Sequence, residues 1–175
     1  MILNNIKQKR DRGFTIVELL VVIVVIGILA AITIVSYTGI TNKANTTKAL
    51  SNAQAVQTVA ETIAADNASA YPATAAAFAT GSTTTKLPAG ISVIPGLPGV
   101  GGVFTGTDPL IALDAATKLK TVTWACSSVA AVSPSCSNLN GGRITFWDFT
   151  TPGQSSTVIY VGAATATSNF YAPAS

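Results

Sequence analysis

The segment that most constrains this chain runs from Arg12 to Ile32 and reads RGFTIVELLVVIVVIGILAAI. It contains one carboxylate, Glu18, and no further charged side chain follows until Lys43. An apolar run of this length can cross a bilayer. A carboxylate inside a membrane helix costs up to about 3 kcal/mol unless something pairs with it. The sequence therefore predicts a membrane segment in which Glu18 needs an explanation.

Charge is distributed unevenly along the 175 residues, and the net charge of +3 at pH 7 comes from one end. Before Gly13 there are four basic residues and one acid, and after Gly13 there are six of each. Apolar residues make up 49% of the chain and charged residues only 10%, which leaves room for one globular domain plus an anchor. A broad basic surface for nucleic acid is not expected, because such binding needs many cationic contacts to phosphate.

The residues that usually carry chemistry are few. The chain has no His and two Cys, which excludes triads and metal sites built on His. Cys126 and Cys136 lie beyond the apolar segment, and a pair outside the membrane favours a disulfide. The acids that follow the helix, Asp108 and Asp114 among them, are scattered, and we interpret them as solvated surface groups. The sequence predicts no enzyme, no cofactor and no metal site.

The basic residues before Gly13 place the N-terminus in the cytoplasm by the positive-inside rule. Three interpretations compete for the segment that follows. In the first, the segment is a secretory signal that is cleaved near Ala30 and Ala31. In the second, it is an uncleaved anchor. In the third, it follows a short leader, and cleavage occurs between Gly13 and Phe14, before the apolar run. The first two interpretations give Glu18 no purpose.

The octapeptide Gly13-Phe14-Thr15-Ile16-Val17-Glu18-Leu19-Leu20 resembles the class III signal of type IV prepilins and pseudopilins. The resemblance covers roughly Lys9 to Tyr37. It implies that a prepilin peptidase cleaves after Gly13, that Phe14 becomes the N-methylated terminus, and that Glu18 serves filament assembly. The chain lacks the helix-bending proline that many type IV pilins carry near Val35.

A physical argument for Glu18 accompanies this resemblance. Cleavage leaves a charged amine on Phe14, and the Glu18 carboxylate of a neighbouring subunit can meet it. Two unit charges about 4 Å apart attract by roughly 4 kcal/mol at an effective dielectric near 20. Because one axial offset between subunits pairs the charges, Glu18 would set the register of assembly. The alternative is that Glu18 simply lies at the headgroup interface.

The helix itself is expected to extend well beyond the membrane. No proline occurs from Phe14 to Asp66, which predicts a helix over about 14–66 that ends before Tyr71-Pro72. Its first half is apolar on all sides. Its second half carries an apolar stripe at three- or four-residue spacing that would pack on a globular head. A coiled-coil dimer is the competing interpretation of this stripe. The stripe comprises Leu50, Ala53, Val56, Ala60, Ile63 and Ala64.

The C-terminal part switches to the two-residue period of strands. Strands are expected at Thr121–Val129, Arg143–Phe149 and Thr157–Val161, and short helices around Ala73–Ala79 and Asp108–Asp114. Cys126 falls in the first strand and Cys136 in the loop after it. Short turns between consecutive strands favour an antiparallel meander with one face on the helix. The fold class is α+β and pilin-like: a long N-terminal helix packed by its C-terminal half on a small antiparallel sheet.

We expect residues 1–13 to be a leader peptide, 14–36 the transmembrane and polymerisation half of the helix, and 37–175 the globular head. The expected function is a structural subunit of a type IV pilus-like surface filament, serving adhesion, motility or DNA uptake. The expected partners are copies of the chain, the prepilin peptidase, the pilus assembly machinery of the inner membrane, and the membrane before assembly. A pseudopilin of a type II secretion system is the alternative. A membrane-anchored enzyme or binding protein is a third.

Overall fold

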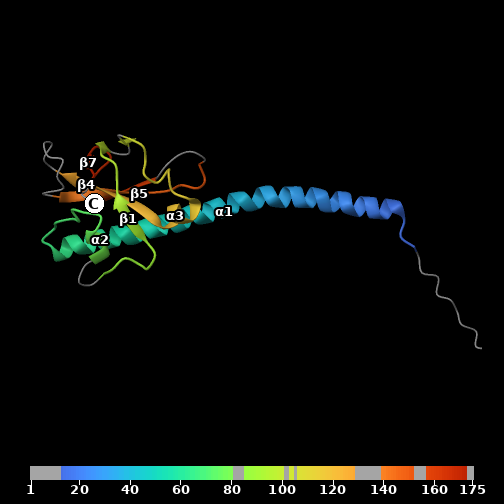
Figure 1. Cartoon of the computed structure of the whole chain (residues 1–175), viewed down its shortest axis with the longest axis horizontal. Helices are drawn as coiled ribbons and strands as arrows, with labels where there is room; N and C mark the ends of the chain where they lie inside the picture. Colours follow the sequence, from blue (N-terminus) through green and yellow to red (C-terminus); the bar gives the residue numbers. More distant parts are fainter. Residues whose placement is uncertain are drawn as a thin grey trace, which may run out of the picture. The chain divides into compact units, whose positions relative to one another are not determined.

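The computed structural model describes residues 13–80, 85–100, 103–104, 106–128, 139–151 and 157–172 (Figure 1). The chain divides into two compact units, Met1–Ile40 and Thr41–Ser175. We call the second unit the head. Cys136 and the basic leader residues lie outside the described residues.

The helix α1, Ile16–Asp66, contributes residues to both units. Its observed end agrees with the predicted one, and the local sequence explains why it ends there. The backbone N–H and the side-chain Nδ2 of Asn67 both donate to the carbonyl of Ile63, each at 3.0 Å. Ala68 and Ser69 then adopt positive φ angles of 51° and 70°. This left-handed turn satisfies helix carbonyls and diverts the chain before Pro72 arrives.

The predicted meander is present at the centre of the sheet. β4 (Thr121–Ser128) pairs antiparallel with β5 (Leu139–Phe146), and β5 pairs antiparallel with β6 (Thr157–Gly162). Within the described residues the sheet has seven strands in the order β3-β2-β7-β4-β5-β6, with β1 paired to β4 as a branch. The strands are β1 Ser92–Pro95, β2 Gly99–Val100, β3 Val103–Phe104, β4 Thr121–Ser128, β5 Leu139–Phe146, β6 Thr157–Gly162 and β7 Asn169–Tyr171.

The sheet is mixed rather than purely antiparallel, which corrects the prediction. β1 runs parallel to β4, with Ser92 opposite Thr121 and Pro95 opposite Trp124. A parallel pair needs a crossover connection, and here the connection includes β2, β3 and the short helix α3, Ala115–Lys120. β7 uses the same edge of β4 further along, opposite Cys126 and Ser127. Two short strands therefore share one edge of β4.

The head has one main core, between α1 and the sheet. The buried face of α1 agrees with the predicted stripe, except that Leu50 is only half-buried and the buried Ala49 and Val59 were not predicted. The stripe is used within the chain, which leaves no free face for the coiled-coil interpretation. The core cluster comprises Ala49, Ala53, Val56, Val59, Ala60 and Ile63 of α1, Phe78 of α2 (Ala77–Thr80), and Val122, Trp124, Ile144, Phe146 and Val161 of the sheet.

Trp124 is the largest side chain of this core, and a glycine makes room for it. A Cβ placed on Gly142 would lie 2.2 Å from the Cη2 atom of the Trp124 ring. The ring meets Phe78 edge-on, with 5.2 Å between centroids. Its Nε1 donates to the carbonyl of Pro72 at 3.0 Å, which satisfies the one polar atom that the ring buries. Gly142 therefore cannot carry a side chain without displacing the centre of the core.

The opposite face of the sheet buries charge, which the sequence did not indicate. Arg143 in β5 is fully buried, and its Nη2 donates to the carbonyl of Leu97 at 2.6 Å. Its guanidinium lies 4.7 Å from the centroid of the Phe170 ring. Burial lowers the pKa of Arg143. Asp108 is 5% exposed, so the expectation that it is a solvated surface acid is wrong.

Candidate functional site

The N-terminal motif begins with two residues that the rest of the chain leaves open. The Phe14 side chain is 84% exposed. A Cβ placed on Gly13 would meet no heavy atom within 4 Å. The fold of the chain itself therefore does not require glycine at position 13. If glycine is needed there, the requirement comes from a protein that binds this segment.

Glu18 takes part in a capping box with Thr15, at the start of α1. Glu18 Oε2 accepts a hydrogen bond from the backbone N–H of Thr15 at 2.9 Å and one from its Oγ1 at 2.8 Å. The backbone N–H of Glu18 donates to Thr15 Oγ1 at 3.2 Å. Such reciprocal bonds satisfy backbone donors that the first helical turn leaves without partners. Sequence reasoning did not identify Thr15, although its spacing from Glu18 is the known signature of this cap.

The capping box uses only one oxygen of the carboxylate. Both bonds from Thr15 go to Oε2, and within the described residues no bond to Oε1 is recorded. An ionised carboxylate can accept several hydrogen bonds, shared between its two oxygens. The cap therefore orients the side chain and leaves Oε1 without a hydrogen bond from the described residues.

The first part of α1 presents apolar side chains on all sides. From Ile16 to Ile40 every large apolar residue is at least 48% exposed. The most apolar window of 18 residues in α1 has a mean hydropathy of 3.1, and none of it is buried. Among the described residues, α1 is the one helix long and apolar enough to cross a membrane.

The few polar side chains in this part of the helix bond to the helix itself. Thr33 Oγ1 donates to the carbonyl of Ala30 at 2.9 Å, and Ser36 Oγ donates to that of Ile32 at 3.1 Å. Hydroxyl groups satisfied in this way are compatible with lipid or with a bundle of apolar helices, because neither offers water as a partner.

The predicted disulfide falls at the boundary of what the structure describes. Cys126 is buried in β4, and its Sγ lies 3.4 Å from the carbonyl oxygen of Tyr171. Cys136 is outside the described residues, so the pairing of the two cysteines stays a prediction.

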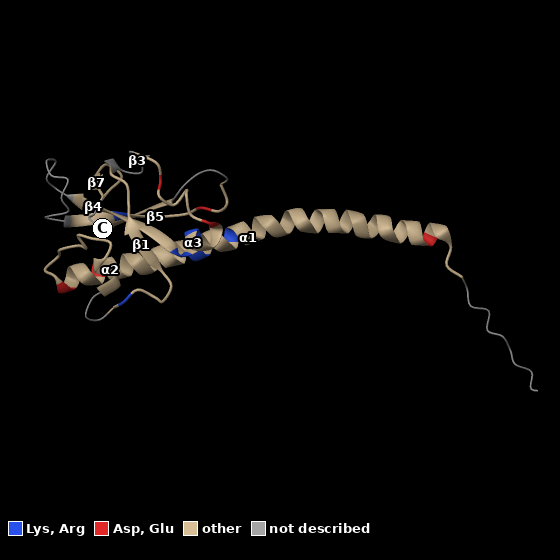
Figure 2. Cartoon of the chain, viewed as in Figure 1, with Lys and Arg blue, Asp and Glu red and all other residues tan. Residues whose placement is uncertain are grey.

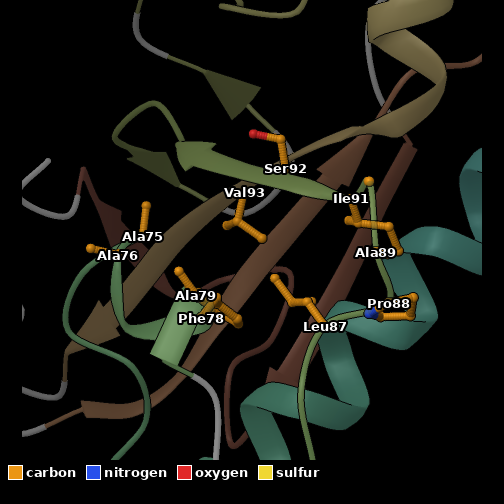
Figure 3. A pocket seen from close by; sticks show the side chains of 11 residues that line it. Ala75, Ala76, Phe78, Ala79, Leu87, Pro88, Ala89, Ile91, Ser92 and Val93 are labelled. Atoms are coloured by element: carbon orange, nitrogen blue, oxygen red, sulfur yellow. The ribbon is translucent and has the colours of Figure 1, made fainter.

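The head contains a pocket of about 380 Å³ beside α2 (Figure 3). Its lining is alanine, proline and apolar side chains, including Phe78, Leu87 and Val93. The one hydroxyl in the lining belongs to Ser92, which lies on the opposite side of β1 from Val93. Among the described residues no group of three or more His, Cys, Asp or Glu side chains could hold a metal ion. The pocket thus offers no acid, base or metal for catalysis.

The comparisons with known proteins match only parts of the chain. The model of the prokaryotic N-terminal methylation motif matches residues 8–34, a range that includes Gly13, Phe14 and Glu18. A fimbrial protein of Pseudomonas aeruginosa is 44% identical over 54 residues, which are 31% of this chain and 35% of the relative. No solved structure matches the chain significantly.

Proteins of a second kind match the chain over a similar length. The type II secretion system core protein G of Dickeya chrysanthemi is 39% identical over 67 residues, or 38% of this chain and 43% of that protein. The protein of the same description from Klebsiella michiganensis is 37% identical over 68 residues, covering 39% and 47%. The chain thus spans less than half the length of the curated relatives it matches. With its methylation motif, its long apolar helix and its mixed sheet, the chain is a type IV pilin-like, or prepilin-like, protein.

Proposed function

We propose that this protein is a structural subunit of a type IV pilus-like surface filament and is not an enzyme. The observation that carries the proposal is the exposed apolar part of α1, which follows Gly13 and Phe14 and contains the capped Glu18 in its first turn. The precursor is anchored in the membrane with its N-terminus in the cytoplasm. A prepilin peptidase cleaves after Gly13, and the new terminus at Phe14 is N-methylated.

The burial of α1 supports assembly through the helix. The head covers the helix from Ala49 onward, but the large apolar side chains from Ile16 to Ile40 are exposed among the described residues. Leaving so much apolar surface in water is unfavourable by about 25 cal/mol for each Å². Lipid covers it before assembly, and the same segments of neighbouring copies cover it in the filament. The pilus assembly machinery of the inner membrane moves the subunit from one environment to the other.

The arrangement at Glu18 supports a role in setting register. The cap from Thr15 orients the carboxylate and leaves Oε1 to accept a hydrogen bond from the charged Phe14 amine of a neighbouring subunit. The resulting attraction of roughly 4 kcal/mol at 4 Å is available at one axial offset only. Subunits at this axial offset are therefore favoured over subunits at any other offset.

The test is electron microscopy of filaments sheared from the surface of the native host, with the subunit identified by peptide sequencing. We expect filaments that contain this protein, and their loss on deletion of its gene. Absence of this protein from every surface filament would contradict the proposal. Secretion-system relatives also match part of the chain, so a pseudopilin function is the alternative. It predicts no surface filament and a loss of protein secretion in the deletion strain.

A further inference from the structure

Four of the five lysines that the structure describes lie in two helices that meet in the head. Lys43 and Lys48 are in α1, and Lys118 and Lys120 are in α3. The side-chain Nδ2 of Asn52, one turn after Lys48, donates to the carbonyl of Leu119 at 2.9 Å. Figure 2 shows the blue segments of α1 and α3 gathered where these helices lie together.

The aromatic side chain of Trp147 lies against one of these lysines. The Nζ of Lys118 lies 3.9 Å from the centroid of the Trp147 ring. The loop after β5 is attached to α1 by Thr46, whose Oγ1 donates to Asp148 Oδ1 at 3.0 Å and accepts from the Phe149 N–H at 2.9 Å. We call the set of Lys43, Lys48, Lys118, Lys120 and Trp147 the basic cluster.

The positive charge of the basic cluster is not neutralised within the head. Lys43, Lys48 and Lys120 are exposed, and no ion pair to any of them is recorded among the described residues. Asp148 accepts hydrogen bonds from threonine hydroxyls, and Asp114 caps α3. Even with these two carboxylates counted against the four lysines, the surface keeps a charge of +2.

The two acids near the C-terminal end of α1 are too far away to compensate. Glu61 follows Lys48 by thirteen residues, which is about 20 Å along the helix axis. Asp66 lies further still. Both distances exceed the screening length of about 8 Å at physiological salt. The basic cluster therefore attracts an anionic partner from outside the chain.

Chain continuity indicates which anionic partner is at hand. Lys43 follows Ile40, the last large residue of the apolar run, within one turn of the continuous helix α1. When that run lies in a bilayer, Lys43 is carried to the level of the headgroups. Tryptophan is enriched at that level, and lysine extends its ammonium toward it. The residue types of the basic cluster are those expected at a membrane surface.

We propose that the basic cluster docks the head on anionic phospholipid headgroups while the precursor waits in the membrane. The proposal rests on the membrane-anchored precursor of the proposed function, but not on filament formation. Each basic residue near an anionic bilayer strengthens binding by about fivefold. Docking would hold the head against the bilayer in one orientation before assembly.

The experiment uses the full chain in vesicles of phosphatidylcholine, with or without phosphatidylglycerol. The readout is acrylamide quenching of Trp147 emission, taken as the difference between wild type and Trp147→Phe, because Trp124 is buried in the core. We expect Trp147 to be shielded in the anionic vesicles only, and exposed again at high salt. Lys43→Gln, Lys48→Gln and Lys120→Gln should each weaken docking by about fivefold. The control Lys86→Gln, an exposed lysine outside the cluster, should change nothing.

Equal quenching in neutral and anionic vesicles would overturn the proposal. The proposal would also be overturned if the shielding of Trp147 depended on the protein-to-lipid ratio and not on lipid charge. The basic cluster would then contact a second copy of the chain. Flotation with both kinds of vesicle reports the anchor separately. A chain that does not float refutes the anchor and this proposal together, whereas a chain that floats without charge-dependent shielding refutes the docking alone.

Discussion

Two substitutions at the start of α1 separate the local role of Glu18 from its role between subunits. Glu18→Gln keeps an oxygen that can accept the bonds from Thr15, since glutamine also completes a capping box. It removes the charge that would attract the neighbouring amine. Thr15→Val does the opposite, because it removes the hydroxyl of the cap and leaves the carboxylate in place. Thr15→Ser retains the cap and is the matched control.

The expected magnitudes differ enough to be distinguished. Losing an attraction of roughly 4 kcal/mol lowers the association constant of the pair by about a thousandfold. Losing an N-cap costs about 1 kcal/mol, which is about fivefold. Glu18→Gln should therefore abolish filaments, while Thr15→Val should reduce them and Thr15→Ser should leave them unchanged. A neutral side chain also enters lipid more easily than a carboxylate, so poor membrane insertion cannot account for the loss in Glu18→Gln.

The assay is the amount of subunit in the sheared filament fraction, divided by the amount of cleaved subunit in the membrane. This ratio removes any effect of the substitutions on processing, because position 15 lies close to the expected cleavage site. Cleavage itself is followed by the mass of the membrane-bound subunit in each variant.

The reverse order of severity would refute the reasoning. If Glu18→Gln forms filaments at the wild-type level, the charge of Glu18 has no part in assembly. If Thr15→Val is as defective as Glu18→Gln, the carboxylate acts only as a helix cap, and register is set by other contacts of the apolar helix.

Three further predictions concern single positions. Gly13→Val should block cleavage without changing the stability of the head, since a Cβ there meets nothing within 4 Å. The measurements are whether the precursor stays uncleaved and whether its unfolding temperature is unchanged. Gly142→Ala should destabilise the head by about 1–3 kcal/mol, because its Cβ would overlap the Trp124 ring. Thermal unfolding of the purified chain measures this, and Gly39→Ala, at an open helical position without a positive φ, is the control. The hydrogen bonds from Thr150, with a smaller contribution from Thr46, lower the pKa of Asp148. Because the folded pKa is lowered, this stabilisation is present above the unfolded pKa of about 3.9 and is lost as the pH falls below it. Asp148→Asn should therefore reduce the loss of unfolding free energy at acid pH. An unchanged loss would show that Asp148 does not contribute to it.

The sequence was most informative where a pattern repeats over many residues. The three- and four-residue spacing from Ala53 to Ala64 predicted the buried face of α1, and the alternation after Thr121 predicted the central meander. It did not predict β1, because Ser92–Pro95 lies between glycines and prolines and its parallel pairing depends on a strand almost thirty residues away.

The burial of charged side chains could not be predicted from the sequence either. Nothing local distinguishes Arg143, which is fully buried, from an exposed arginine, because its burial depends on the loop that carries Leu97. Thr15 is a different case. Its capping box with Glu18 is local and could have been predicted from the three-residue spacing. The resemblance to the prepilin motif pointed to Glu18, and the role of Thr15 in orienting it was not predicted.

The most direct test of the central claim is the intact mass and N-terminal sequence of the mature protein from its native host. We expect a chain that begins at Phe14 and carries one methyl group on its terminal amine. A mature protein that begins at Met1, or near Ala31, would contradict it.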